Sequence, residues 1–92
     1  MPSTVILRAG PMGYRYKLTV NHNVHNAVMR EPDMPDYAAG ERVTLTAVPG
    51  EGWTFWYWRG DLHGSENPKE IVLDRDKQVT AAFKKQVEGE PI

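Results

Sequence analysis

The most constraining feature of this chain is residues 52–60, which read Gly-Trp-Thr-Phe-Trp-Tyr-Trp-Arg-Gly and hold five of the nine aromatic residues in 92. Successive side chains of an extended strand point to opposite faces, so simple alternation would place large rings on both. A domain of this length has one core and can bury one such face. The segment is therefore either a buried strand with surplus rings on the surface, or a platform for a ligand or partner.

Composition narrows the functional classes. The chain has no cysteine, which excludes disulfides, zinc–thiolate sites and thiol catalysis. Its net charge is -1 and its basic residues are scattered, so we expect no nucleic-acid partner. No apolar run approaches the roughly 20 residues that span a bilayer, and the first residues lack the pattern of a secretion signal. We therefore expect no membrane insertion.

Alternation of apolar and polar residues predicts strands at 14–20, 42–47 and 78–83, with two shorter ones at 27–30 and 70–73. The turn formers between them indicate a hairpin loop at 21–26 and a tight turn at 74–77 joining the last two strands. Residues 31–39 contain two prolines and read as an exposed connection; if the chain has a helical turn, we expect it between positions 35 and 39.

These patterns predict an all-β fold, a small, mainly antiparallel domain of five or six strands with at most one helical turn. Phe55 and Trp58 are three residues apart, so a bulge or bend near Trp56 and Tyr57 would bring both into one core. We expect the structural core to comprise Phe55, Trp58, Leu45, Val43, Phe83, Val79 and Leu18.

Five motifs occur in a fixed order. They are Gly-Glu-Arg-Val-Thr-Leu-Thr-Ala-Val-Pro at 40–49, Gly-Trp-Thr-Phe at 52–55, Trp-Arg-Gly-Asp at 58–61, Ser-Glu-Asn-Pro at 65–68, and Asp-Lys-Gln-Val-Thr-Ala-Ala-Phe at 76–83. Their order and spacing resemble the divergent internalin-B B-repeat family, also called the bacterial repeat domain. Relatives commonly have a glycine-rich hairpin at the position of 21–26, and small or aliphatic residues at positions 56 and 57.

The resemblance implies a module of bacterial cell-surface or secreted proteins, often found in tandem arrays or beside catalytic and adhesive modules. It also implies an extracellular or cell-surface location, a non-catalytic role and, as a fallback architecture, a β-grasp-like fold. The family supplies no catalytic residues, so none is carried over.

The aromatic rings of 52–60 that one core cannot bury suggest a binding surface, because exposed clusters of large apolar side chains usually mark one. We expect Trp56 and Tyr57 to form such a surface, with Trp53 beside them. Flat rings stack on the apolar faces of sugars, and Arg59, Asp61 and His63 would then supply hydrogen bonds at the rim. A carbohydrate platform would use Trp53, Trp56, Tyr57 and Trp58, and it requires an exposed, coplanar pair of rings.

The sequence gives little support for a metal site or a catalytic site. His22, His25 and His63 have neither the spacing nor the cysteine partners of a zinc site. The acidic residues lack the spacing of a calcium loop. Asp61 and Glu66 share one short loop and do not flank a cleft as a glycosidase pair would. We therefore predict no enzyme activity, no metal and no cofactor.

The resulting hypothesis is a non-catalytic accessory module at 14–85, acting as a spacer or protein-interaction domain toward a protein partner or a neighbouring domain of the same polypeptide. It is flanked by an N-terminal tail or added edge strand at 1–13 and a C-terminal tail at 86–92. The alternatives are a carbohydrate-binding module with a polysaccharide ligand, or a small standalone structural or binding protein such as a phage component.

Overall fold

The computed structural model describes residues 14–86. The predicted N-terminal segment 1–13 lies outside this range, as do residues 87–92 of the predicted C-terminal tail. Eight strands and no helix occur in the described part, which confirms the all-β prediction. Six strands have four or more residues. In order, the strands are β1 Arg15–Tyr16, β2 Leu18–Asn21, β3 Ala27–Glu31, β4 Tyr37–Ala38, β5 Glu41–Val48, β6 Trp53–Gly60, β7 Lys69–Leu73 and β8 Lys77–Lys85.

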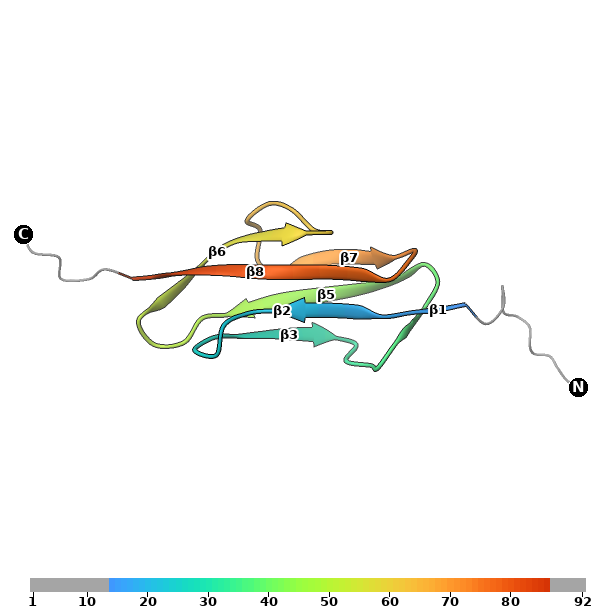
Figure 1. Ribbon diagram of the computed structural model, residues 1–92, viewed down its shortest axis with the longest axis horizontal. Coiled ribbons are helices and arrows are strands. Elements are labelled where there is room, and N and C mark those ends of the chain that lie inside the picture. Colours follow the sequence, from blue (N-terminus) through green and yellow to red (C-terminus); the bar gives the residue numbers. More distant parts are fainter. Residues whose placement is uncertain (1–13, 87–92) are drawn as a thin grey trace, which may run out of the picture.

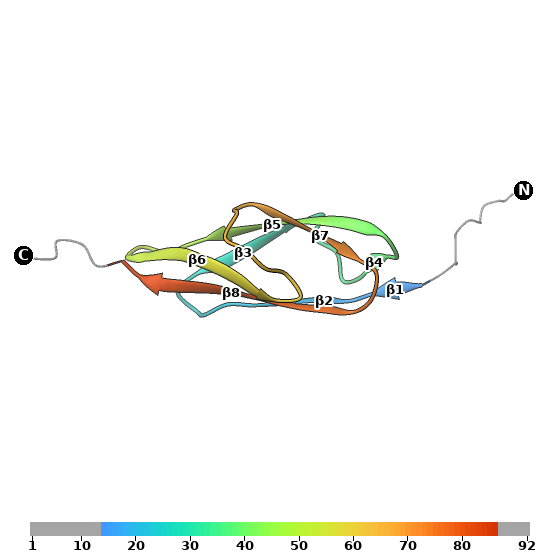
Figure 2. The same ribbon diagram turned by 90° about the horizontal axis from the view of Figure 1, so that it is seen from above.

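The strands form two three-stranded sheets and one short ribbon. One sheet has the order β2-β8-β6, the other has the order β3-β5-β7, and β1 pairs with β4. The two larger sheets lie as two layers (Figure 2), the arrangement of a small β-sandwich. Every pairing is antiparallel except that of β2 with β8, which is parallel.

The core lies between the two sheets. Its residues come from alternate positions of the strands, because each strand presents one face to the opposite sheet. Trp58 is 2% exposed and is the largest of the buried side chains. The buried hydrophobic residues are Leu18, Tyr37, Val43, Leu45, Ala47, Trp58, Leu62, Ile71, Leu73, Val79 and Ala81. Of the seven residues expected in the core, five are in this set, and Phe55 and Phe83 are partly buried against it.

No helical turn forms between positions 35 and 39, which agrees with the prediction of at most one. Strand β4 occupies that place and pairs with β1 through Tyr37 and Tyr16. Tyr37 is fully buried, so 31–39 is not simply an exposed connection. Its hydroxyl donates to the Pro32 carbonyl at 2.7 Å and accepts from the Met34 N–H at 3.2 Å. The two prolines hide the strand because the sequence around them has no alternation, whereas one deeply buried tyrosine anchors it.

The loop at 22–26 is not a hairpin loop, contrary to the sequence prediction. It joins β2 to β3, which belong to different sheets. Asn26 is the polar residue that holds it: its Oδ1 accepts from the Gly50 N–H at 2.7 Å, and its Nδ2 donates to Asn23 Oδ1 at 2.6 Å. The turn after β7 likewise crosses between sheets, because β7 pairs with β5 and β8 pairs with β2 and β6.

The described chain enters and leaves the sandwich at opposite ends of its long axis. In Figure 1, β1 and β2 begin at one end and β8 finishes at the other. This follows from topology, because β2 and β8 run in the same direction side by side and are the first and last of the longer strands. Residues 14 and 86 are therefore separated by the length of the sheet.

Candidate functional site

A β-bulge at Trp56 sorts the aromatic rings of β6. Phe55 pairs with Phe83 and Tyr57 pairs with Ala82, so Trp56 is an extra residue without a partner on β8. This register shift returns Trp58 to the same face as Phe55, and their ring centroids lie 4.9 Å apart. The bulge that the sequence predicted is confirmed. Its consequence is that Phe55 and Trp58 contact the core while Trp56 and Tyr57 do not belong to it.

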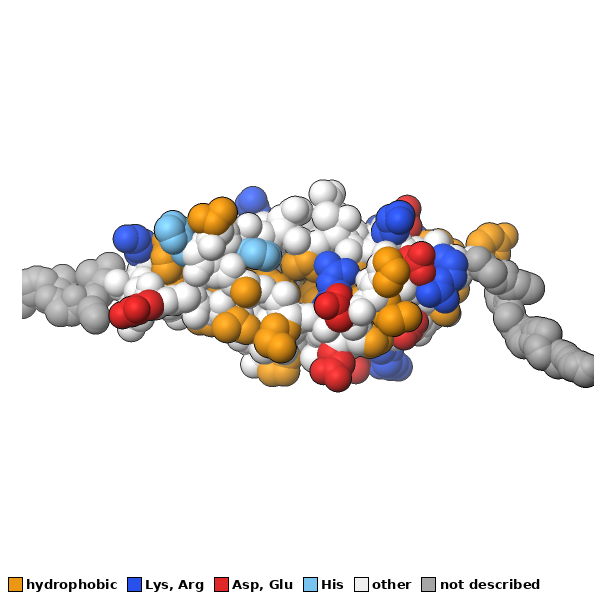
Figure 3. Space-filling model, turned by 90° about the horizontal axis from the view of Figure 1, so that it is seen from below, with side chains coloured by type: hydrophobic (Ala, Val, Ile, Leu, Met, Phe, Trp, Pro, Cys, Tyr) orange, Lys and Arg blue, Asp and Glu red, His pale blue; other side chains and the backbone are white. Residues whose placement is uncertain are grey.

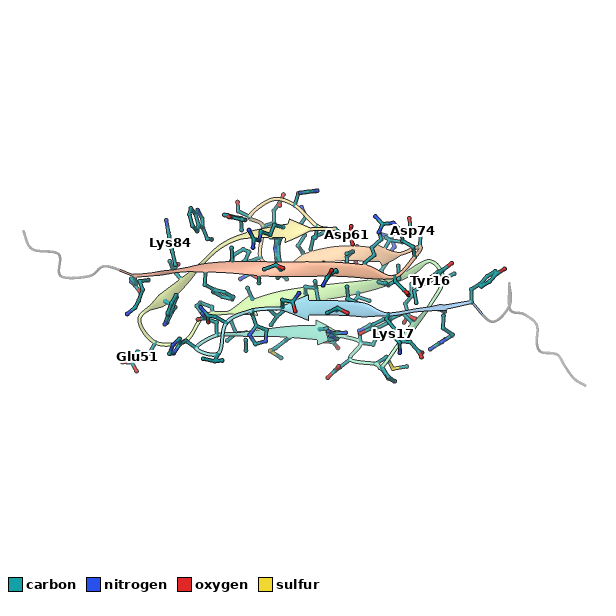
Figure 4. All side chains as sticks on the ribbon, viewed as in Figure 1. Tyr16, Lys17, Glu51, Asp61, Asp74 and Lys84 are labelled. Carbon is teal, nitrogen blue, oxygen red and sulfur yellow. The ribbon has the colours of Figure 1, made fainter. Side chains whose placement is uncertain are left out.

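Trp56 forms the centre of an exposed aromatic cluster. Its side chain is 49% exposed, and the Tyr57 ring lies 4.9 Å away at an interplanar angle of 60°. The Lys84 ammonium lies 5.2 Å from the centroid of the Trp56 ring, within the range of a cation–π contact. We call Trp56, Tyr57 and Lys84 the outer aromatic cluster. Lys84 extends from the β6–β8 sheet near one end of the molecule (Figure 4).

Trp53 is not part of this cluster. Its ring stacks on His25 at 5.3 Å with an interplanar angle of 14°, and the Lys85 ammonium lies 5.6 Å from its centroid. Trp53 pairs with Lys85 and Thr54 with Lys84, so Trp53 and Lys84 lie at alternate positions of the pleat. Trp58 is buried and donates its Nε1–H to the Glu66 carbonyl at 2.7 Å. The sequence hypothesis of one platform made of Trp53, Trp56, Tyr57 and Trp58 is therefore wrong, and the 60° angle denies it a coplanar pair.

The expected rim residues are divided between two places. Arg59 is exposed and follows Tyr57 by two positions on β6, so the two share a face. His63 is exposed in the loop after β6. Asp61 instead lies against the start of β8, where it accepts from the Gln78 N–H, and is well separated from Lys84 (Figure 4).

A hollow of about 370 Å³ lies around Asp61, lined by Lys17, Thr19, Asp61, Asp76, Lys77 and Gln78. The Asp61 carboxylate is already engaged: Oδ2 accepts from the Gln78 N–H at 2.8 Å and Oδ1 from the Arg75 guanidinium at 3.2 Å. These two hydrogen bonds, that of Gln78 first, hold the pKa of Asp61 below its ordinary value of 3.8. The arrangement ties the end of β6 to the start of β8.

Three other charged or ring nitrogen groups contact residues close to them in the sequence. Lys69 donates to Glu66 at 2.8 Å and lowers the pKa of that carboxyl, and Lys77 does the same for Asp74 at 3.0 Å. His22 Nδ1 lies 2.8 Å from the Asn23 carbonyl. Among residues 14–86, no three histidine, aspartate or glutamate side chains gather as metal ligands would.

Local sequence patterns could not predict several of the residues that contact the aromatic rings and the start of β8. His25 reaches Trp53 from the loop after β2, and Lys84 reaches Trp56 from β8. Both contacts depend on pairing between distant strands, and a scattered lysine or a loop histidine carries no local signal of it. Asp76 and Lys17 meet for the same reason, at a separation of 59 residues.

The described residues include no helix, and hence none long and apolar enough to cross a membrane. Hydrophobic and charged side chains alternate over the face drawn in Figure 3 and do not gather into one continuous apolar area.

Comparison with models of protein families identifies the family of this domain. The sequence model of the divergent InlB B-repeat domain matches residues 16–87, more than half of the chain. The matched range begins in β1 and ends two residues after β8, so it covers both sheets of the sandwich. The comparisons with curated proteins and with solved structures gave no match. The chain belongs to the divergent InlB B-repeat domain family, a family of bacterial repeat domains.

Proposed function

We propose that this domain is a non-catalytic spacer of a bacterial surface or secreted protein, which holds its neighbouring domains apart at a defined separation. The observation that carries the proposal is that β1 begins and β8 finishes at opposite ends of the sandwich (Figure 1). A domain whose chain enters and leaves at the same end would add little to the distance between its neighbouring domains. Membership in a repeat-domain family supports the same role.

Stiffness is the second property that a spacer needs. A flexible Gly/Ser linker behaves as a random coil with a broad distribution of end-to-end distances. The sandwich instead fixes its ends by two sheets with a common core and by hydrogen-bonded pairing over 14 residues of β6 and β8. We expect the separation of the flanking domains to be narrow.

The test places the domain between two fluorescent proteins and measures single-molecule energy transfer between them. The control replaces residues 14–86 by a Gly/Ser linker of equal residue number. The proposal predicts a narrow distribution of transfer efficiency for the domain and a broad one for the linker. Equally broad distributions would contradict the spacer role.

The outer aromatic cluster favours a second candidate function, self-association through the β6–β8 face. A tryptophan that is 49% exposed, held by a bulge and a lysine, is unusual on a surface that contacts only water. The net charge of -1 leaves little repulsion between two copies of the chain. Burial of Trp56 against a second copy would then be the main source of affinity.

Sedimentation velocity over a range of concentrations tests this second candidate. We expect concentration-dependent association that Trp56→Ala abolishes. Val24→Ala is the matched control, because Val24 is 90% exposed in the loop before Asn26 and lies outside the cluster. A single monomeric species at every concentration would contradict self-association. A change in tryptophan fluorescence on titration with polysaccharides, lost in Trp56→Ala, would instead favour the carbohydrate alternative.

A further inference from the structure

The pairing of β2 with β8 has a mechanical consequence. These strands are parallel neighbours, with Leu18 opposite Lys77 and Asn21 opposite Thr80. They are also the first and last of the longer strands: the described chain reaches β2 through the short β1 at one end of the sandwich and leaves from β8 at the other (Figure 1). Tension applied through the two ends would pull β2 along its axis in one direction and β8 along its axis in the other.

The direction of that load decides how the pairing resists it. The hydrogen bonds between neighbouring strands lie across the strand axes. When strands slide along their axes, all of these bonds are strained together and must break nearly at once. When strands are peeled apart from one end, the bonds break in succession, each at a smaller force. The β2–β8 pairing is loaded in the first of these ways.

Hydrogen bonds beyond the paired strands strengthen the same junction. The Lys77 N–H donates to the Lys17 carbonyl at 2.9 Å, and the Lys17 N–H donates to Asp76 Oδ1 at 2.9 Å. Asp61 accepts from the Gln78 N–H and donates its own N–H to the Gln78 carbonyl at 2.9 Å. The entry residue of β2 and the first residues of β8 are thus bonded to each other and to the end of β6.

The other side of β2 is also supported. Leu18 is buried and Val20 packs against the core, so sliding of β2 would expose apolar surface to water. Arg30 of β3 donates to the Leu18 carbonyl at 2.9 Å, which links β2 to the second sheet. Displacing β2 therefore breaks contacts with both layers of the sandwich.

We propose that the β2–β8 pair, together with Asp76, is a mechanical clamp that lets this domain resist tension between its neighbours. This inference rests on the proposed spacer function, because only a domain with neighbours on both sides is placed under tension. It goes beyond spacing, since a rigid spacer need not withstand force.

Force spectroscopy with two pulling geometries tests the clamp. The chain has no cysteine, so pairs of introduced cysteines give unique attachment points. Tyr14→Cys with Gln86→Cys loads β2 and β8 along their axes, whereas Tyr14→Cys with Arg75→Cys peels them apart from one end. The first variant also carries Arg75→Ser, so that both lack the exposed Arg75–Asp61 ion pair. At equal loading rate we expect a severalfold higher unfolding force in the first geometry, and equal forces would overturn the proposal.

A second comparison locates the resistance at Asp76. Asp76→Ala removes the acceptor for the Lys17 N–H, and Asp76→Asn keeps an oxygen there. Asp74→Ala is the matched control, because Asp74 forms its ion pair with Lys77 in the same turn. In the axial geometry we expect Asp76→Ala to lower the unfolding force and the other two variants to leave it close to that of the parent. An unchanged unfolding force in Asp76→Ala would show that Asp76 does not contribute to the clamp.

The outcomes of the two tests are distinguishable. A narrow separation of the flanking fluorescent proteins with equal forces in both geometries would retain the spacer and reject the clamp. A broad separation would reject the spacer, whatever force the domain withstands.

Discussion

At the scale of single residues, Trp58 illustrates how one aromatic side chain serves two needs. It is 2% exposed in the core, and its indole N–H donates to the Glu66 carbonyl of the loop after β6. In addition, its backbone N–H donates to the Gly64 carbonyl at 2.8 Å. The ring fills the core while its polar groups hold the loop, so no other aromatic residue can replace it fully.

We predict that Trp58→Phe destabilises the domain by about 2 kcal/mol or more, since it leaves a cavity and an unpaired carbonyl. Trp56→Phe is the matched control and should change the stability by less than about 0.5 kcal/mol, because Trp56 is half exposed. Urea unfolding followed by circular dichroism measures both. Similar losses in the two variants would show that the outer cluster is as structural as the core.

Three carboxylates with lowered pKa values make the stability of the domain depend on pH in the acid range. The pKa values of Asp61, Glu66 and Asp74 are all lowered by hydrogen bonds, from Gln78 and Arg75, from Lys69, and from Lys77 respectively. A group whose pKa is lower in the folded state stabilises the fold above its unfolded pKa, and this contribution is lost as the pH falls through the folded pKa.

We therefore predict a stability that is flat near neutral pH and declines below about pH 4.5. Asp61→Asn removes one of the three titrating groups, so its stability should decline less between about pH 4.5 and pH 2.5. Denaturant midpoints measured across this range give the comparison, with Asp33→Asn as a control at an exposed position outside the strands. If Asp61→Asn and the parent lose stability in parallel, Asp61 does not hold β8 as described.

At the scale of elements, β6 shows what alternation can and cannot predict. The sequence predicts the strand, and the spacing of Phe55 and Trp58 predicts the bulge, because one core requires both rings. The position of the bulge then determines which rings lie outside the core. The partners of those rings do not follow, since Lys84 and His25 come from strands and loops that are distant in the chain.

We predict that deletion of Trp56 leaves the domain folded. Trp56 has no partner on β8, so its removal restores regular pairing from Phe55 through Tyr57 to Trp58 without turning any of them to the other face. Deletion of Arg59 is the control. It moves Gly60 out of its place against β8, where even an added Cβ would lie 2.6 Å from the Gln78 carbonyl oxygen.

Cooperative thermal unfolding and the near-ultraviolet dichroism of the tryptophans measure both deletions. We expect the deletion of Trp56 to keep a cooperative transition and the deletion of Arg59 to lose it. Loss of cooperativity in both would mean that the bulge is required for folding and is not simply accommodated.

At the scale of the whole molecule, sequence patterns predicted the strands better than their arrangement. Alternation at 42–47 and 78–83 identified the inward faces of β5 and β8, since it reflects burial directly. The turns at 22–26 and 74–76 were uninformative about topology, because a short loop that crosses between sheets uses the same residues as a hairpin. The parallel β2–β8 pair joins residues 59 apart and has no local signature.

The parallel β2–β8 pair is also the basis of both proposals made for this domain. It places the two ends of the described chain far apart and makes the first and last of the longer strands neighbours. The spacer role and the clamp both depend on it, whereas the aromatic cluster that dominates the sequence bears on self-association alone. The residues that first draw attention are therefore not those on which the proposed function depends.

Both proposals require that residues 14 and 86 lie at opposite ends of the sandwich while residues 14 and 75 lie at the same end. Spin labels on Tyr14→Cys/Gln86→Cys and on Tyr14→Cys/Arg75→Cys measure both separations by pulsed dipolar spectroscopy. We expect a single long distance for the first pair and a clearly shorter one for the second. A first distance that is equal to or shorter than the second would contradict the parallel pairing of β2 with β8 and both proposals built on it.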